Sequence, residues 1–129
     1  MEDYRVSFIS ADDKPEWRSL FEGYAAFYKT PLNDEIADEV WGWLVDPDHV
    51  FEGLIVRDEQ SKALGIAHVR ACPRSLSGCD IGFVDDMFVD PNARGSGAAD
   101  ALVGLVGVGP AQPLDKKAKR GGNQGVFGA

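Results

Sequence analysis

The stretch PNARGSGAADAL, residues 91–102, limits the possible folds of this chain more than any other segment. It places two glycines and then two alanines between a strand-like apolar segment and a segment with helical spacing. Glycine permits positive φ and lacks the Cβ that would hold a ligand away from the backbone. Because the first amides of a helix have no partner inside the helix and lie at its positive end, such a turn can bind an anion. The segment therefore predicts a pyrophosphate cradle, with close packing of a helix on a strand as the alternative explanation.

The spacing of this turn separates it from two common phosphate-binding loops. It lacks the GK[ST] ending of a P-loop, and GSGAAD does not match the G-x-G-x-x-G spacing of a dinucleotide-binding turn. We therefore expect a cradle of a different type.

Hydrophobic periodicity divides the chain before residue 107 into strands and helices. The predicted elements are a strand over 4–9, a helix ending near 29, a helix capped by Asn33 or Asp34, strands over 51–57, 63–71 and 80–89, and a helix from 98. The strands over 51–57 and 63–71 are expected to form a hairpin, and residues 72–78 a loop. The last helix is expected to bury one face: Ala99, Leu102, Val103 and Val106.

Length and composition are those of one globular domain. The chain has 129 residues, of which 44% are hydrophobic and 26% charged. No apolar run reaches the roughly 18 residues of a membrane span, and the acidic start MEDYR is unlike a signal peptide, so we expect a cytoplasmic protein without a membrane partner. Cys72 and Cys79, with no histidine nearby, make a poor zinc site, so we expect reduced thiols and no bound metal.

Charge is distributed unevenly along the chain. The whole chain carries −8 and residues 108–129 carry +3, so residues 1–107 carry −11. An acidic body disfavours nucleic acid as a partner and suits a cationic or amine ligand.

The sequence pattern changes after residue 107. Residues 108–129 contain five glycines and two prolines and keep neither a helical nor a strand period. We expect this segment to be a disordered tail that does not belong to the domain before it, produced by a truncation or a shift of reading frame.

The order of the predicted elements, with Arg94-x-x-Gly97-x-Ala99 at the turn, resembles the GNAT superfamily of acyl-CoA N-acyltransferases. That family carries Q/R-x-x-G-x-G/A after a strand ending in a run such as DDMFVDP, and the resemblance covers residues 4–107. It implies an α/β fold with a mixed, mostly antiparallel central sheet flanked by helices. Residues 1–107 would be the N-terminal part of a GNAT acetyltransferase domain whose C-terminal strands are missing.

The resemblance also implies a reaction. Acetyl-CoA would be the cosubstrate, and its acetyl group would pass to a primary amine of a small molecule or a protein. The segments WRSLFEGYAAFYKTPL, VWGWLVDP and GIAHVR are similar to the branch that acetylates small amines and polyamine-like substrates.

Two groups of residues match the acetyl-CoA site of the family. Six match the positions whose backbone amides receive the pyrophosphate: Arg94, Gly95, Ser96, Gly97, Ala98 and Ala99. The Arg94 side chain could also flank the phosphates as a permanent cation. Met87, Phe88 and Val89 match the strand end whose backbone pairs with the pantetheine arm.

Two adjacent carboxylates, Asp85 and Asp86, interrupt the strand over 80–89. Strand alternation sends them to opposite faces, unless the bulge that the family has here redirects one. An alkyl ammonium must lose a proton before it attacks a thioester, so we predict Asp85 as the catalytic, substrate-side carboxylate. Asp86 and Tyr28 are predicted to bind the substrate, whereas pairing of one aspartate with Arg70 is the structural alternative. His68, a lone strand histidine, is expected to be structural.

The resemblance leaves alternatives open. Family members often use a tyrosine from the C-terminal part to protonate the departing thiolate, and no tyrosine follows Tyr28 in this chain. The chain could therefore be a CoA-binding module without catalysis or an inactive fragment. Whether it forms a homodimer, and which group acts as general acid, are left open by the sequence.

Overall fold

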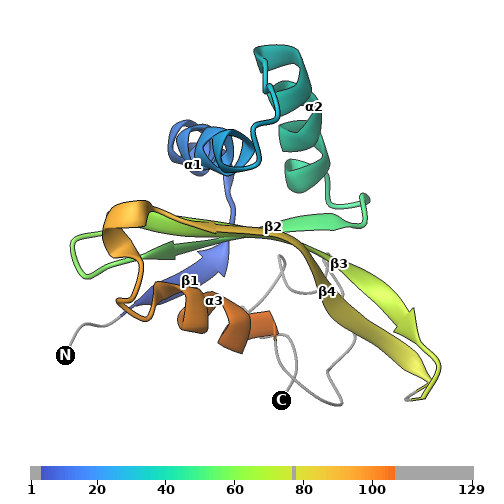
Figure 1. The fold of residues 1–129 in the computed structure, drawn as a ribbon. Coiled ribbons are helices and arrows are strands. Elements are labelled where there is room, and N and C mark those ends of the chain that lie inside the picture. The colour runs from blue at the N-terminus through green and yellow to red at the C-terminus, as the bar shows by residue number, and fades with distance from the viewer. Residues whose placement is uncertain (1–3, 77, 107–129) are drawn as a thin grey trace.

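The computed structural model describes residues 4–76 and 78–106. It contains one sheet with α1 and α2 on one face and α3 on the other (Figure 1). The elements are β1 (Arg5–Phe8), η1 (Ala11–Asp13), α1 (Lys14–Phe27), α2 (Asp34–Val45), β2 (Phe51–Arg57), β3 (Ala63–Arg74), β4 (Cys79–Val89), η2 (Pro91–Ala93) and α3 (Ala98–Val106). The predicted α/β fold class is confirmed, whereas the predictions for residues 108–129 lie outside the described residues. No helix in the described part of the chain is long and apolar enough to cross a membrane.

The four strands follow the order β1-β2-β3-β4, and each neighbouring pair is antiparallel. β4 lies at the edge of the sheet, and within the described residues its only strand partner is β3. Asp86 pairs with His68 whereas Val84 pairs with Val69, which leaves Asp85 as an extra residue in β4. The bulge expected at the two aspartates is therefore present.

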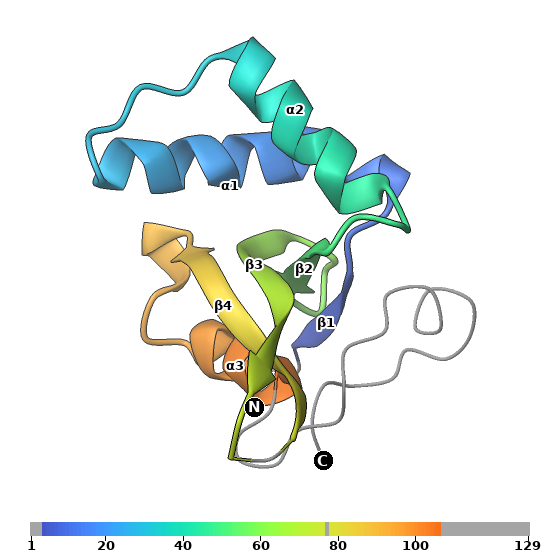
Figure 2. The ribbon, with the colours of Figure 1, turned by 90° about the vertical axis from the view of Figure 1, so that its right-hand side faces the viewer.

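Two apolar cores lie on the two faces of the sheet. Trp17 of α1 and Leu44 of α2 are fully buried against one face, together with Ile55 and Ile66 of the sheet. Leu102 of α3 is fully buried against the other face. Figure 2 shows the C-terminal half of α1 and the connection to α2 lying above the end of β4. This arrangement brings the α1–α2 connection close to the strand that carries both aspartates.

The hairpin of β3 and β4 is longer than the sequence predicted. Residues 72–78 were expected to form a loop, but β3 continues to Arg74 and β4 begins at Cys79. β2 ends its pairing with β3 at Arg70, so the missing amide of Pro73 breaks no hydrogen bond to β2.

The buried face of α3 is also shifted from the expected one. Ala98 and Leu102 are buried, whereas Ala99 is exposed and Val103 is 40% exposed. The side chain of Val106 lies outside the described set. The helix begins at Ala98, and the residues that pack on the sheet are Ala98 and Leu102, about one turn apart. The buried face is therefore turned away from Ala99 and Val103.

The end of α1 is closed by a Schellman turn that leads into the α1–α2 connection. Thr30 donates its amide to the carbonyl of Ala25 (2.9 Å), and Lys29 donates to Ala26 (3.0 Å). Lys29 has φ +56°, a conformation that glycine adopts without strain. The helix ends at Phe27, two residues earlier than expected, because the backbone reverses at Lys29.

We therefore predict that Lys29→Gly stabilises the fold by about 0.5–1 kcal/mol, because it relieves the strain of a left-handed residue. Thermal or urea unfolding followed by circular dichroism measures this change. Lys29→Ala removes the same charge but keeps the Cβ, and it should give no gain. An equal gain in both variants would contradict the backbone explanation.

Candidate functional site

The glycine turn adopts the backbone conformation that its sequence predicted. Gly95 has φ +83° and Gly97 has φ +107°, and both values lie in the region that glycine favours. A Cβ on Gly97 would also lie 3.3 Å from Cε2 of Tyr4. The turn follows η2 and delivers the chain into α3, whose first residue is Ala98.

The backbone amides of this turn divide into two sets. Arg94 donates to the carbonyl of Pro91 (3.4 Å), and Ser96 donates to that of Ala93 (3.2 Å). Among the described residues, the amides of Gly95, Gly97, Ala98 and Ala99 have no hydrogen-bond acceptor. Three of these residues, Gly95, Gly97 and Ala99, line a hollow of about 360 Å³ together with Val89, Ala93, Arg94 and Asp100. Four of the six amides predicted to receive a pyrophosphate are thus available, although Asp100 adds a negative charge to the lining.

The Arg94 side chain turns back toward β4 and α1. Its Nε donates to the carbonyl of Val89 (3.0 Å), and its guanidinium carbon lies 5.3 Å from the centre of the Phe88 ring and 5.7 Å from that of Phe27. In this conformation Arg94 stabilises the entry to the turn. Its predicted contact with phosphates stays a prediction.

The end of β4 leaves its backbone at the sheet edge. The side chains of Phe88 and Val89 are buried on opposite faces of the sheet, and Met87 packs against the same core as Val89. These side chains are therefore occupied by the cores. Only the backbone of residues 87–89 is left to pair with a ligand.

A second hollow, of about 420 Å³, lies where α1, the α1–α2 connection and β4 meet. It is lined by Phe21, Tyr24, Ala25, Tyr28, Thr30, Pro31, Leu32, Ile36 and Asp86, and we call it the acceptor pocket. The structure thus brings together Tyr28 and Asp86, the two residues predicted to bind the substrate. The centres of the Tyr24 and Tyr28 rings are 4.9 Å apart.

Asp86 is held by a chain of hydrogen bonds that begins in the core. The indole Nε1 of Trp17 donates to Nε2 of His68 (2.9 Å), and Nδ1 of His68 lies 3.0 Å from Oδ2 of Asp86. Tyr24 donates its hydroxyl to Oδ1 of Asp86 (2.7 Å). An indole N–H can only donate, so Nε2 of His68 must accept and Nδ1 must carry the proton that is donated to Asp86. His68 is fully buried and acts as a neutral orienting group.

These contacts fix the protonation states at the pocket. Burial opposes ionisation of Asp86, but the hydrogen bonds from His68 and Tyr24 outweigh it and hold the pKa of Asp86 below its ordinary value. Burial first, and then the hydrogen bond to Asp86, raises the pKa of the Tyr24 phenol well above its ordinary value. Asp86 therefore remains an ionised acceptor, and Tyr24 remains a donor, across the neutral range.

Asp85 has a different environment. Nε of Arg70 donates to its Oδ2 at 2.8 Å, and Arg70 lies over the ring of Phe83, 5.0 Å from its centre. Asp85 is not among the residues that line the acceptor pocket. Asp86 lines this pocket, whereas Asp85 forms the pair with Arg70 that the sequence left as the structural alternative. The catalytic role predicted for Asp85 stays a prediction.

Sequence reasoning gave Trp17, Tyr24 and His68 no part in the site. Trp17 and Tyr24 are seven residues apart on one helical face, and this spacing was the available signal that both reach the sheet.

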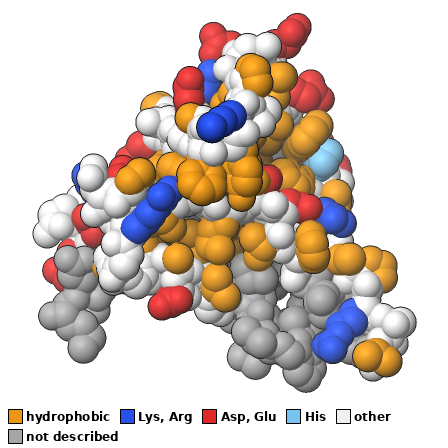
Figure 3. All heavy atoms as spheres, in the orientation of Figure 1, with side chains coloured by type: hydrophobic (Ala, Val, Ile, Leu, Met, Phe, Trp, Pro, Cys, Tyr) orange, Lys and Arg blue, Asp and Glu red, His pale blue; other side chains and the backbone are white. Residues whose placement is uncertain are grey.

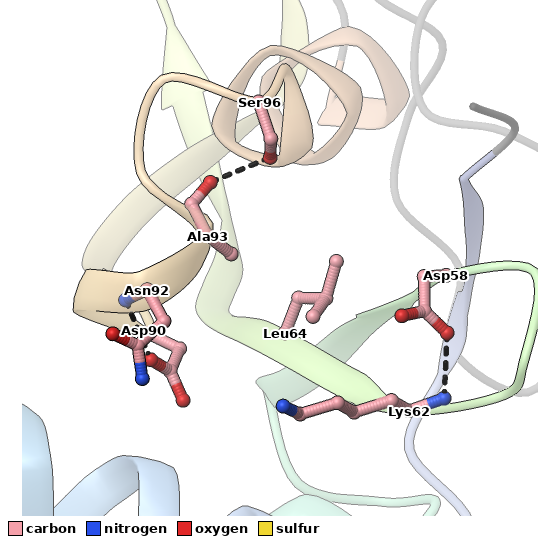
Figure 4. Close-up of a pocket in the computed structure, with 7 residues that line it drawn as sticks. All are labelled: Asp58, Lys62, Leu64, Asp90, Asn92, Ala93 and Ser96. Carbon is pink, nitrogen blue, oxygen red and sulfur yellow. Dashed lines mark hydrogen bonds between the residues drawn. The ribbon is translucent and has the colours of Figure 1, made fainter. Parts of the chain in front are cut away.

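A smaller polar pocket of about 220 Å³ lies beside the glycine turn (Figure 4). Three of its polar side chains hold turns. Asp58 accepts from the amide of Lys62, Asp90 accepts from that of Asn92, and Ser96 donates to the carbonyl of Ala93. The described residues also contain no cluster of three histidine, cysteine or carboxylate side chains suited to a metal ion. We assign no ligand to this pocket.

Comparison with known proteins places these features in a family. The model of the acetyltransferase (GNAT) family matches residues 17–106. The D-amino-acid N-acetyltransferase HPA3 of Saccharomyces cerevisiae is 28% identical over 102 residues, which are 78% of this chain and 63% of that protein. The chain thus spans less than two thirds of the length of this relative.

Solved structures share the fold. A ribosomal-protein-alanine N-acetyltransferase from Brucella melitensis superposes with a TM-score of 0.66 and 25% identity, over 81% of this chain and 70% of that one. The aminoglycoside N-acetyltransferase AAC(6')-Iy in complex with CoA gives a TM-score of 0.66 at 19% identity, over 82% of this chain and 68% of that one.

The hydrogen bond between Tyr24 and Asp86 yields a stability prediction. Tyr24→Phe should lower the free energy of unfolding at pH 7 by about 1–3 kcal/mol, because a hydrogen bond to a partly buried carboxylate is lost. The folded-state pKa of Asp86 is lowered, so this stabilisation is present above about pH 4 and is lost as the pH falls through the folded-state value. Denaturant unfolding at pH 7 and near pH 3 measures both parts.

Tyr28→Phe is the matched control, since Tyr28 is 60% exposed and its loss of a hydroxyl should change stability by less than about 0.5 kcal/mol. Equal losses in the two variants, or a Tyr24→Phe loss that does not depend on pH, would disprove the assigned network.

Proposed function

The chain belongs to the GNAT acetyltransferase family, and we propose that it transfers the acetyl group of acetyl-CoA to a primary amine. One observation carries the proposal: four backbone amides at a glycine turn have no hydrogen-bond acceptor within the described part of the chain, and they follow the edge strand β4. The structure of the similar AAC(6')-Iy protein contains CoA, which supports the choice of cosubstrate.

The residues of the turn fit an acetyl-CoA pyrophosphate. We propose that Gly95, Gly97, Ala98 and Ala99 donate their amides to it and that residues 87–89 pair with the pantetheine arm through their backbone. The backbone at position 97 has a positive φ that residues with a Cβ rarely adopt, and a Cβ there would crowd Tyr4. Both facts explain the glycine. Bound acetyl-CoA supplies the thioester that carries the acetyl group.

We propose that the two aspartates have different roles toward the amine, one in binding and one in proton transfer. Asp86 and Tyr28 bind the amine in the acceptor pocket. A carboxylate with a lowered pKa holds a cation well but is a weak proton acceptor, so Asp86 suits binding better than proton abstraction. Asp85, next to it in the bulge, is proposed to receive the ammonium proton, directly or through water.

A direct test incubates the chain with acetyl-CoA and a panel of amines and measures thiol release together with the mass of the products. Acetylated amine supports the proposal. Binding of CoA by calorimetry without thiol release would instead favour a CoA-binding module. Absence of both binding and turnover would contradict the assignment.

Gly97→Ala should abolish CoA binding and destabilise the fold by about 1–3 kcal/mol, because alanine at φ +107° is strained. Gly104→Ala is the control, since Gly104 lies in α3 and a Cβ there meets nothing within 4 Å. The control should bind CoA unchanged. Titration calorimetry measures both variants, and normal CoA binding by a folded Gly97→Ala protein would count against the cradle.

Asp85→Asn should lower kcat by roughly 10²–10⁴, the usual contribution of a general base, with little change in amine KM. Arg70→Met removes the ion pair with Asp85 but keeps the carboxylate, so kcat should stay within about a few fold. Steady-state kinetics with a saturating amine separates these cases. Equal losses of kcat in the two variants would assign Asp85 a structural role.

A further inference from the structure

We infer that the preferred acceptor is a primary amine on a hydrophobic, otherwise uncharged group of about one ring in size. This inference rests on the proposed function and concerns the acceptor pocket alone. Three properties of the pocket carry it: its charge, its fixed carboxylate and its apolar wall.

The charge of the lining selects a single cation. Of the nine residues that line the acceptor pocket, Asp86 is the one that carries a charge at neutral pH. An amine substrate that also bears a carboxylate would place that group near Asp86 with no lining cation to pair with it. Like charges repel strongly in a partly desolvated pocket, so amino acids are disfavoured.

The hydrogen bonds of Asp86 limit how many amines the pocket can bind. Tyr24 takes one position on Oδ1 and His68 takes one on Oδ2. A carboxylate offers about four lone-pair positions, so about two remain, enough for one ammonium group. Further ammonium groups of a polyamine or an aminoglycoside would face uncharged side chains.

The wall of the pocket favours an apolar substituent. Tyr24 lies between the rings of Phe21 and Tyr28, with ring centres 6.4 and 4.9 Å away. Tyr28 is 60% exposed and Ile36 is 47% exposed, so a ligand can bury apolar surface on both. Figure 3 shows hydrophobic side chains gathered between α1, α2 and the sheet on this face. An ammonium group near these rings also gains from cation–π attraction.

The size of the pocket matches a small substituent. Its volume of about 420 Å³ lies toward the small end of ligand sites, which range over about 300–1,000 Å³. A phenyl ring or a short alkyl chain fits this volume better than a sugar with several rings.

Binding of three probes tests the inference without any need for turnover. 2-Phenylethylamine carries the ammonium and the ring, D-phenylalanine adds a carboxylate, and kanamycin is a large polycation. NMR titration in the presence of CoA should give 2-phenylethylamine an affinity roughly tenfold or more above both others. Equal or tighter binding of D-phenylalanine or kanamycin, or no binding of 2-phenylethylamine, would overturn the inference.

Two substitutions test the cause of the preference. Asp86→Asn should weaken 2-phenylethylamine by roughly tenfold and reduce its advantage over D-phenylalanine. Ile36→Lys adds a cation to the exposed rim of the pocket and should improve D-phenylalanine relative to 2-phenylethylamine. Val50→Lys, at a site that is 54% exposed and outside the pocket, should leave the ratio unchanged. An unchanged ratio in folded Ile36→Lys protein would overturn the charge argument.

The outcomes separate this inference from the proposed function. Acetylation of D-phenylalanine or kanamycin in preference to 2-phenylethylamine would keep the transferase and refute the acceptor class. Failure of CoA itself to bind would refute the transferase, and the acceptor inference would fall with it.

Discussion

The hydrogen bond from the indole of Trp17 to Nε2 of His68 is the interaction on which the helix side of the sheet depends. It joins α1 to β3 inside the core. Because Nε2 of His68 accepts this bond, the proton is on Nδ1, which donates to Asp86. The Asp86 carboxylate also accepts a hydrogen bond from the hydroxyl of Tyr24, which lies on α1 as Trp17 does. A buried hydrogen bond thus orients a carboxylate at the edge of the acceptor pocket.

The edge strand β4 contains a bulge and is followed by the glycine turn. Each of these two irregularities shapes a different part of the site. The bulge at Asp85 lets Asp85 and Asp86 reach partners on the same face of β3, Arg70 and His68. The glycine turn after Val89 frees backbone amides at the start of α3. Between them lies the short stretch of residues 87–89 whose side chains fill the cores and whose backbone lies at the edge. A thioester bound along that stretch would lie between the amide cradle and the acceptor pocket.

The sequence predicted features that depend on local signals, such as the glycine turn and the cap of α2. The cap was expected at Asn33 or Asp34, and Oδ1 of Asn33 accepts from the amide of Ile36. It could not supply the features that depend on distant partners. Whether Asp85 or Asp86 faces the pocket follows from the register of β3, which alternation within β4 cannot supply. The role of His68 depends on Trp17, 51 residues away in the chain. β3 continues through Pro73 because β2 has already ended, which local propensity also cannot show.

The central claim is that backbone amides of the glycine turn bind the diphosphate of coenzyme A. Amide-resolved NMR during a CoA titration tests it most directly. The account predicts the largest shifts at Gly95, Gly97, Ala98 and Ala99, with smaller ones at Arg94 and Ser96, whose amides already have carbonyl partners. Saturable CoA binding that leaves the first four resonances unmoved would contradict the account.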